Sequence, residues 1–555
     1  MDLTQFYHIL DKLQTSTIQS YIINLGREYS RLLDEDLNMK QVIEKGSEIL
    51  NKLFIKRLVV KENTSDGKVS KIMITPKLDI TLSDRIKFYP IETEVPEYNR
   101  QSYTLNDKRY GLILHNQFGI SRVSTKCLDT IKKLSSIPIQ IDSSLSDWTR
   151  IPKNIEALEQ ENFKKESDLF RNTQKEYHNK IVYFHYRFDN RGRMYNNGYT
   201  LNPQGDEYSK AAITLANKEI ITDEGSKYLI YDIANNYGLD KLTRERKLAW
   251  FEDNKEMIIE TGHKSLFKEE ADKPLLFQKG CKAYLDYLEG KESGYICQMD
   301  ATASFAQIMA VLSKDKDLAI ITNLTDVPNR YDFYSEVIKE FLLVSKSNVD
   351  LKTARSYLKK ALMVWAYNGE KEFNRVITKP ENRKLFKEIL QSVAKGAYEI
   401  REAINNVYLE LSDRALFNYI LPDNFQVSLP QIDTERVKVS SPFYNVTVQY
   451  DVNRPNIENN RRFLTPSFIH SIDAYIAREM IRRVDYDMLV NHDSFMSHPN
   501  NCEKSLEHYK DILNKINYSN LFDNLLSQMY GQKIESKFTN REPLNLIHRS
   551  TYALC

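Results

Sequence analysis

Two aspartates stand at the ends of short apolar segments, where a carboxylate could hold a metal ion. Asp300 follows the apolar run 295–299 and precedes a small-residue segment, and Asp493 follows the apolar run 488–490. Carboxylate oxygens suit Mg²⁺, and two of them side by side would complete a two-metal site for phosphoryl transfer. A single aspartate at such a position is more often a helix N-cap, so each residue alone is a weak signal.

Residues 351–373 predict a helix with two distinct faces, since successive residues turn by about 100°. One face is apolar and would be buried. The other presents two cations one turn apart, a methionine and a tyrosine, with Lys360 beside them: Arg355, Lys359, Met363 and Tyr367. Such cations can grip a triphosphate, and Met and Tyr can stack on a base. The alternative is a basic surface stripe that ends in a half-buried tyrosine.

A third motif, Asp189-Asn-Arg191-Gly-Arg193, follows an apolar strand at residues 181–184. Two arginines around a glycine allow a backbone turn to approach a polyanion while the guanidinium groups bind phosphate oxygens. The alternative is a surface turn in which an arginine pairs with the neighbouring aspartate.

Composition excludes several classes of protein. The chain has 555 residues, of which 41% are hydrophobic, and 78 Lys+Arg against 76 Asp+Glu give a net charge of +2. This length predicts several domains or one large core. Apolar runs are too short for a membrane span, and five scattered cysteines predict a reducing compartment without structural zinc. Near-zero charge gives no sign of a polyanion partner.

The order of the motifs resembles that of the single-subunit RNA polymerases of bacteriophages and mitochondria, and the chain resembles a short, divergent phage member. Their order is Asp189-x-Arg-Gly-Arg, Asp300 with a glutamine seven residues later, Arg-x₃-Lys-x₃-Met-x₃-Tyr from Arg355, and His-Asp-Ser around Asp493. Segments 202–205, 238–241, 468–473 and 545–555 resemble the family as well.

The resemblance implies a DNA-templated RNA synthesis in which Asp300 and Asp493 hold two Mg²⁺ ions. In the family, residues matching Arg355 and Lys359 grip the nucleotide phosphates, and a lysine matching Lys241 contacts them too. Lys360 and Met363 would belong to the same nucleotide site.

The resemblance also implies contacts with the sugar and with nucleic acid. Tyr367 would select ribose and close on the incoming base pair, with His470 near the 2′-hydroxyl. The template–product duplex would lie against a third group of residues: Asp189, Arg191, Arg193 and Lys210.

The fold implied is a helix-dominated α+β protein shaped as a cupped right hand with palm, fingers and thumb. We expect a reduced N-terminal domain with helices and a β-hairpin around residues 63–67 (1–130), a short thumb from a helix at 155–179 (131–180), a palm with an insertion (181–310), fingers (311–465), and a C-terminal segment that completes the palm (466–555). Residues 125–144 predict a further helix.

Three departures from the family pattern qualify these expectations. Phe305 stands where the family usually has a glycine near the nucleotide sugar, and Asn368 replaces the glycine after the tyrosine, with Gly369 following. The hairpin that reads promoter DNA in phage enzymes is expected to be a stub at residues 449–456. We therefore expect weak or absent recognition of duplex promoters.

Two other functions compete with this interpretation. A DNA polymerase of the related family shares part of the helix motif, although such enzymes usually follow His-Asp with Glu rather than with Ser494. A non-catalytic nucleic-acid-binding subunit descended from a polymerase would tolerate loss of the aspartates, which this chain retains.

The partners expected are a DNA template, the RNA product and NTPs, without a membrane. We expect the cations to surround a cleft and the surplus acid to lie on outward helices such as 156–168. Loading should then depend on an opened template or on a phage-encoded single-strand-binding or promoter-loading factor. The expected location is the host cytoplasm during phage infection.

Overall fold

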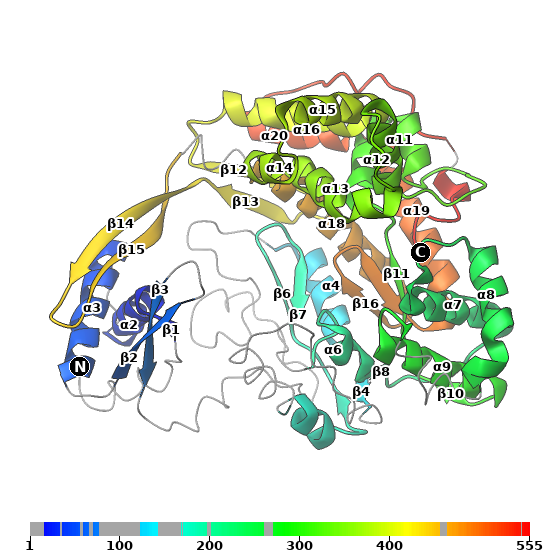
Figure 1. Cartoon of the computed structure of the whole chain (residues 1–555), viewed down its shortest axis with the longest axis horizontal. Coiled ribbons are helices and arrows are strands. Elements are labelled where there is room, and N and C mark those ends of the chain that lie inside the picture. Colours follow the sequence, from blue (N-terminus) through cyan, green and yellow to red (C-terminus); the bar gives the residue numbers. More distant parts are fainter. Residues whose placement is uncertain are drawn as a thin grey trace. The chain divides into compact units, whose positions relative to one another are not determined.

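A computed structural model describes the protein over residues 16–33, 36–55, 59–65, 70–76, 123–142, 168, 170–196, 201–259, 270–455, 463–545 and 547–555. Within these ranges the fold is α+β with helices dominant, as predicted (Figure 1). The chain divides into two compact units. The smaller combines residues 1–87 with 431–459, and the larger combines residues 88–430 with 460–555.

The smaller unit contains two helices that cross closely, α2 (Ile18–Leu33) and α3 (Met39–Ile55). A Cβ atom added to Gly26 of α2 would lie 1.8 Å from the carbonyl oxygen of Val42 in α3. Only glycine therefore allows this approach of the two backbones.

The predicted N-terminal hairpin is present with shifted boundaries. Its strands are β2 (Val59–Ser65) and β3 (Ser70–Pro76), and β1 (Ser16–Thr17) pairs with β3 on the other side. Residues 66–69, which include the last two residues of the predicted loop, lie outside the described residues. Phe54 belongs to α3, and its ring stacks on Phe443 with centroids 4.9 Å apart.

A long ribbon replaces the short hairpin expected at residues 449–456, so that prediction is wrong. Its strands β14 (Ile432–Ser440) and β15 (Asn445–Asn453) have nine residues each and pair along their whole length. Val448 and the neighbouring apolar residues of the ribbon are buried in one core with α2 and α3. This burial explains why residues 431–459 group with the N-terminal residues rather than with residues 311–430.

In the parts that the structure describes, the larger unit contains five small antiparallel sheets. Their strand orders are β5-β4-β8, β6-β7, β10-β9, β11-β17-β16 and β12-β13. The strands are β4 (Ile139–Ile141), β5 (Ile181–Val182), β6 (Tyr186–Phe188), β7 (Met194–Asn196), β8 (Ile213–Leu215), β9 (Glu219–Ile220), β10 (Glu292–Ser293), β11 (Cys297–Asp300), β12 (Leu416–Ile420), β13 (Gln426–Pro430), β16 (Met488–Asn491) and β17 (Ser494–Ser497).

Helices surround these sheets. They are α4 (Thr125–Ser135), α6 (Glu207–Ala211), α7 (Asp223–Ala234), α8 (Arg244–Met257), α9 (Pro274–Leu288), α10 (Ser304–Ser313), α11 (Lys316–Ile321), α12 (Phe333–Val344), α13 (Leu351–Ala366), α14 (Glu370–Val376), α15 (Pro380–Val393), α16 (Lys395–Glu410), α18 (Leu464–Arg483), α19 (Cys502–Tyr518) and α20 (Leu521–Tyr530). A π-helical turn, η3 (Asn235–Leu239), continues α7, and the short turns η6 (Pro499–Asn501) and η7 (Ile547–Arg549) lie near the C-terminal end.

Two predicted helices end earlier than expected. The helix predicted over residues 125–144 stops at Ser135, because Pro138 lacks an N–H donor and the following residues pair as β4 with β5 and β8. Of the helix predicted over residues 155–179, residues 170–176 are helical, and residues 151–167 lie outside the described residues.

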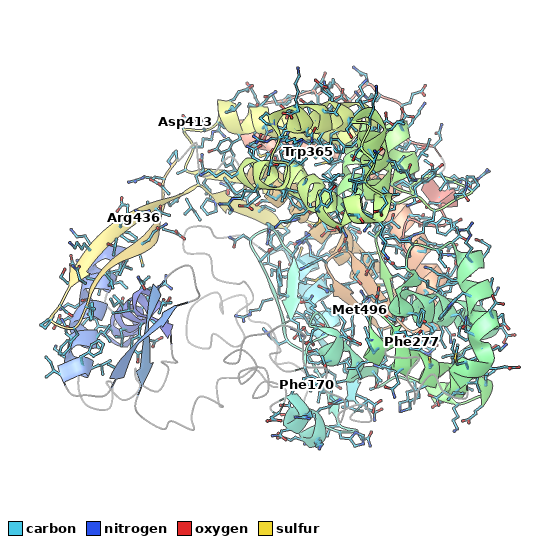
Figure 2. All side chains as sticks on the ribbon, viewed as in Figure 1. Phe170, Phe277, Trp365, Asp413, Arg436 and Met496 are labelled. Carbon is cyan, nitrogen blue, oxygen red and sulfur yellow. The ribbon has the colours of Figure 1, made fainter. Side chains whose placement is uncertain are left out.

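One continuous apolar core fills the larger unit. Trp365 of α13 and Met496 of β17, both labelled in Figure 2, are almost completely buried in it. Along the described ranges, no helix is long and apolar enough to cross a membrane.

A buried ion pair fixes the turn of the Asp-x-Arg-Gly-Arg motif within this unit. The Arg478 guanidinium donates to both carboxylate oxygens of Asp423, at 2.6 and 3.1 Å, and to the Gly192 carbonyl oxygen at 2.6 Å. Gly192 has φ +84°, and a Cβ atom there would lie 2.4 Å from Arg478 Nη1. The glycine therefore serves close packing against Arg478.

The buried pair predicts a large effect of removing one partner. Burial by itself raises the pKa of Asp423, but Arg478 outweighs it, so the pKa lies below its usual value. Asp423→Ala should destabilise the larger unit by about 3–5 kcal/mol, since the Arg478 charge stays buried and uncompensated. Thermal melting would measure this effect. Glu535→Ala, which removes one partner of the exposed Lys533–Glu535 pair, is the control and should leave the melting temperature nearly unchanged; equal melting of both variants would contradict the interpretation.

Candidate active site

A polar cavity of about 520 Å³ lies in the larger unit and collects most of the predicted site residues. Two histidines, seven aspartates and six lysines or arginines line it. The predicted residues among its walls come from several segments far apart in the chain: Arg193, Lys241, Asp300, Arg355, Lys359, Met363, Tyr367, His470 and Asp493.

The sheet β11-β17-β16 brings the two predicted metal ligands together. Asp300 ends β11 and pairs with Ser494, the first residue of β17, so Asp493 stands next to it in the turn between β16 and β17. The Ala301 N–H donates to the Asp493 carbonyl oxygen at 3.0 Å. The Asp300 backbone is also held on its other side, by mutual hydrogen bonds of 2.9 Å with Cys555.

The electrostatics of this pair favour a cation. Burial raises the pKa of Asp493, and the neighbouring carboxylates of Asp473 and Asp300 raise it further. Asp473 is itself engaged, by Arg193 Nη2 at 2.8 Å and by the Ser304 hydroxyl at 2.8 Å. A positive ion between Asp300 and Asp493 would relieve their repulsion.

The donor set matches Mg²⁺ in kind. The described residues contain no group of three or more His, Cys, Asp or Glu side chains arranged to hold a metal. Mg²⁺ typically uses one or two protein carboxylates and completes its shell with water and substrate phosphates. Two carboxylates on the wall of a polar cavity therefore suit it.

Helix α13 presents both predicted faces. Ala354, Leu358, Ala361, Leu362 and Trp365 are buried. The opposite face lines the cavity with the predicted residues Arg355, Lys359, Met363 and Tyr367. The sequence pattern thus assigned both faces of the helix, and the cavity explains why the second face is polar.

Two contacts orient the cations of α13. Arg355 Nε donates to the Asp332 carboxylate at 2.7 Å, and the Lys359 ammonium lies over the Tyr334 ring, 5.0 Å from its centroid. Lys241, at the end of η3, approaches the same cavity and pairs with Asp240 at 2.5 Å.

The helix predicted over residues 351–373 breaks after Ala366. Asn368 adopts φ +56° and its buried amide donates to Asn405 and to Thr465, the latter at 2.8 Å. Asparagine tolerates this left-handed conformation better than most residues, so Asn368 itself, and not Gly369, makes the turn that leaves Tyr367 at the helix end.

The Asp-x-Arg-Gly-Arg motif folds onto itself. One Asp189 oxygen accepts from the backbone N–H groups of Arg191 and Arg193, both at 2.9 Å, and the other accepts from Arg191 Nε at 2.8 Å. Arg191 Nη1 lies 2.8 Å from His470 Nδ1. Because arginine can only donate, Nδ1 accepts and the proton of the neutral imidazole sits on Nε2.

Four predicted site residues do not line the cavity: Asp189, Arg191, Lys210 and Lys360. Arg191 reaches it only through His470, and Lys210 donates to Gln298 at 3.3 Å. Lys360 is exposed on α13.

Aspartates line the same cavity as the predicted cations and pair with them. That the surplus acid lies on outward helices such as 156–168 stays a prediction. Residues 156–167 of the outward helix lie outside the described residues.

Comparison with known proteins identifies the family. The family described as DNA-dependent RNA polymerase matches residues 219–388 and 373–549. The chain belongs to this family. The resemblance seen in its motifs is confirmed, and the matched span includes Lys241, Asp300, α13, His470 and Asp493, whereas the Asp-x-Arg-Gly-Arg motif precedes it.

Individual relatives of this chain are fungal and viral. A probable DNA-directed RNA polymerase of Neurospora crassa is 32% identical over 207 residues, 34% of this chain and 23% of the relative. A DNA-directed RNA polymerase of Pseudomonas phage phiKMV is 34% identical over 177 residues, 30% of this chain and 21% of the relative. A probable DNA-directed RNA polymerase of Gelasinospora is 24% identical over 493 residues, 75% of this chain and 57% of the relative. The matches thus cover well under two thirds of these relatives' own lengths.

Phe305, which departs from the family pattern, forms part of the cavity wall. Its ring packs against Phe333, Tyr334 and Tyr367, with centroids 5.6, 6.4 and 6.2 Å away. The side chain is buried, so it supports the rings of Tyr334 and Tyr367 from behind.

Several residues of the candidate site were not indicated by the sequence patterns. Asp473 belongs to a segment that resembles the family but carried no assigned role, and Asp332 and Gln298 carried no signal at all. Their relevance depends on pairing with residues distant in the chain. Lys273 and Arg330 also line the cavity.

The neutral state of His470 predicts a pH dependence of stability. Burial lowers the pKa of His470 to about 2, with Arg193 and Arg191 contributing. In the unfolded chain its pKa is about 6.5. Below about pH 6.5, His470 is protonated in the unfolded chain but stays neutral in the folded protein. The free energy of unfolding therefore decreases as the pH falls.

His470→Gln should remove the contribution of this histidine to the pH dependence of stability. Between pH 7.5 and 5.5 the parent should lose about 1 kcal/mol more stability than the variant. Chemical denaturation at both pH values would measure it, and because all other histidines are shared, equal losses would contradict a neutral, buried His470.

Proposed function

We propose that the protein synthesises RNA on a DNA template by two-metal nucleotidyl transfer from NTPs to the RNA 3′-hydroxyl, with release of pyrophosphate. The observation that carries the proposal is one cavity lined both by the carboxylates of Asp300 and Asp493 and by the cationic face of α13 with Arg355 and Lys359. Membership of the DNA-dependent RNA polymerase family supports it.

Asp300 and Asp493 would hold two Mg²⁺ ions. Bound there, Mg²⁺ would lower the pKa of the RNA 3′-hydroxyl and neutralise negative charge on the pyrophosphate leaving group. Asp473 would keep its partners Arg193 and Ser304 and act only through its charge.

Arg355, Lys359 and Lys241 would bind the triphosphate. Arg355 and Lys241 are each paired with an aspartate, so their charges are oriented but partly neutralised before substrate arrives. Met363, 40% exposed on the cavity wall, would touch the base, and the exposed Lys360 would contact phosphate or nucleic acid at the rim.

Tyr367 and His470 would read the sugar. Their rings meet edge to face with centroids 5.2 Å apart, and the Nε2–H of His470 is a donor. Burial raises the pKa of Tyr367 to about 12, so its hydroxyl remains protonated and can donate to a 2′-hydroxyl.

Asp189, Arg191, Arg193 and Lys210 would lie along the template–product duplex. The two arginines already bind Asp189, Asp473 and His470, so they would couple the duplex to the sugar-reading residues. The palm would contain β11-β17-β16, the fingers α13, and the thumb residues 131–180. The proposed location is the host cytoplasm of an infected cell. An accessory loading factor is a proposed partner.

Extension of a labelled RNA primer on a DNA template tests the central assignment. Asp300→Asn and Asp493→Asn should each lower the extension rate by about 10³-fold or more, because each removes a carboxylate worth several kcal/mol of transition-state stabilisation. Asp317→Asn changes an exposed aspartate of α11 and is the matched control.

The same assay separates the rival functions. Extension that survives both aspartate variants would refute the metal assignment. A strong preference for dNTPs would favour a DNA polymerase, and a parent protein that binds the primed template without extending it would favour a non-catalytic subunit.

Tyr367→Phe should relax sugar selection. Loss of the hydroxyl removes the group that would bind the ribose 2′-hydroxyl, so the ratio of kcat/KM for NTP over dNTP should fall at least about tenfold. Tyr357→Phe, on the exposed side of α13, is the control. An unchanged ratio in Tyr367→Phe would contradict this role.

Template opening should control initiation. We expect strong synthesis on single-stranded and premelted templates and little on closed duplex carrying the cognate promoter, because net charge near zero gives weak duplex attraction. Runoff assays on the three templates side by side measure this. Efficient runoff from closed duplex without added protein would refute the requirement.

A further inference from the structure

The carboxylate of Asp300 is held from its own strand. Gln298 lies two residues earlier on β11, and side chains two residues apart lie on the same face of a strand. Gln298 Nε2 donates to Asp300 Oδ1 at 2.9 Å. One oxygen of Asp300 thereby accepts from the amide, and the exposed Asp300 side chain lines the cavity.

Lys210 fixes the orientation of the Gln298 amide. Its ammonium, from α6, donates to Gln298 Oε1 at 3.3 Å. An ammonium can only donate, so the carbonyl end of the amide must face Lys210 and the NH₂ end must face Asp300. The direction of the Gln298–Asp300 hydrogen bond follows from this contact.

A buried aspartate anchors the backbone beneath the amide. Asp232 of α7 accepts from the Gln298 N–H at 3.4 Å and from the Tyr295 hydroxyl at 2.6 Å. Asn236 also donates to it, at 3.4 Å. Strand, helix and ammonium thus restrain Gln298 from three sides.

Gln298 also separates two opposite charges. Lys210 is close enough to Asp300 for their charges to interact. With the amide between them, the ammonium stabilises the carboxylate without binding the oxygen that a metal would need. Removal of the amide would leave Asp300 free to rotate and the ammonium free to approach it.

We propose that Gln298, oriented by Lys210, is a positioning residue that holds Asp300 Oδ1 so that the second oxygen faces the metal site. The inference rests on the proposed function, in which Asp300 binds a divalent cation. Hydrogen bonds to metal-binding carboxylates typically change metal affinity by about 10- to 100-fold.

Titration of the full chain with Mn²⁺, with free Mn²⁺ counted by electron paramagnetic resonance, tests the inference without relying on catalysis. Gln298→Met keeps the side-chain length and loses the donor, so it should weaken Mn²⁺ binding at the Asp300-dependent site by about tenfold or more. Gln298→Asn keeps the amide but is too short to reach Asp300, so it should weaken Mn²⁺ binding similarly. This second variant serves as the test if Gln298→Met folds poorly. Gln391→Met, at an exposed position of α15, is the matched control and should bind as the parent does.

The outcomes distinguish this inference from the proposed function. Asp300→Asn defines which Mn²⁺ ions depend on Asp300. If Asp300→Asn weakens binding but neither Gln298 variant does, the positioning role is overturned and the metal assignment stands. If Asp300→Asn leaves binding unchanged, both the metal assignment and the positioning role fall.

Discussion

The pairing of β11 with β17 is the constraint on which the site depends. Asp300 and Ser494 are almost two hundred residues apart in the chain, yet they are cross-strand partners, and this register sets Asp493 beside Asp300. Burial raises the pKa of Asp493, and the neighbouring carboxylates of Asp473 and Asp300 raise it further. The surrounding core holds them together nevertheless, so the fold stores an unfavourable charge arrangement that a cation would relieve.

Around that pair, the cavity is organised as matched charges. Arg193 pairs with Asp473, Arg355 with Asp332, and Lys241 with Asp240. The cavity therefore carries nearly equal numbers of acidic and basic side chains, as the whole sequence does. Such pairing orients the long cationic side chains in the cavity. In the proposed function, a triphosphate would therefore meet individual oriented cations rather than a general positive field.

The sequence could predict the features that depend on local spacing. The two faces of α13 followed from a periodicity of 3.6 residues, and the family followed from the order of its motifs. The break at Asn368 could not be predicted, because the left-handed turn is stabilised by Asn405 and Thr465 from other helices. For the same reason the long ribbon was missed, since its burial against α2 and α3 depends on residues about 400 positions away. Gln298 is the extreme case, because one glutamine in a strand carries no signal until Lys210 and Asp300 are seen on either side of it.

The account makes its central claim about the place of the metal ions. Anomalous scattering from Mn²⁺ in crystals of the protein with a primed DNA template and an NTP would test it most directly. The account predicts anomalous density between the carboxylates of Asp300 and Asp493, beside the triphosphate held by α13. Well-ordered Mn²⁺ bound elsewhere, with no density between these two carboxylates in a complex that contains the nucleotide, would contradict it.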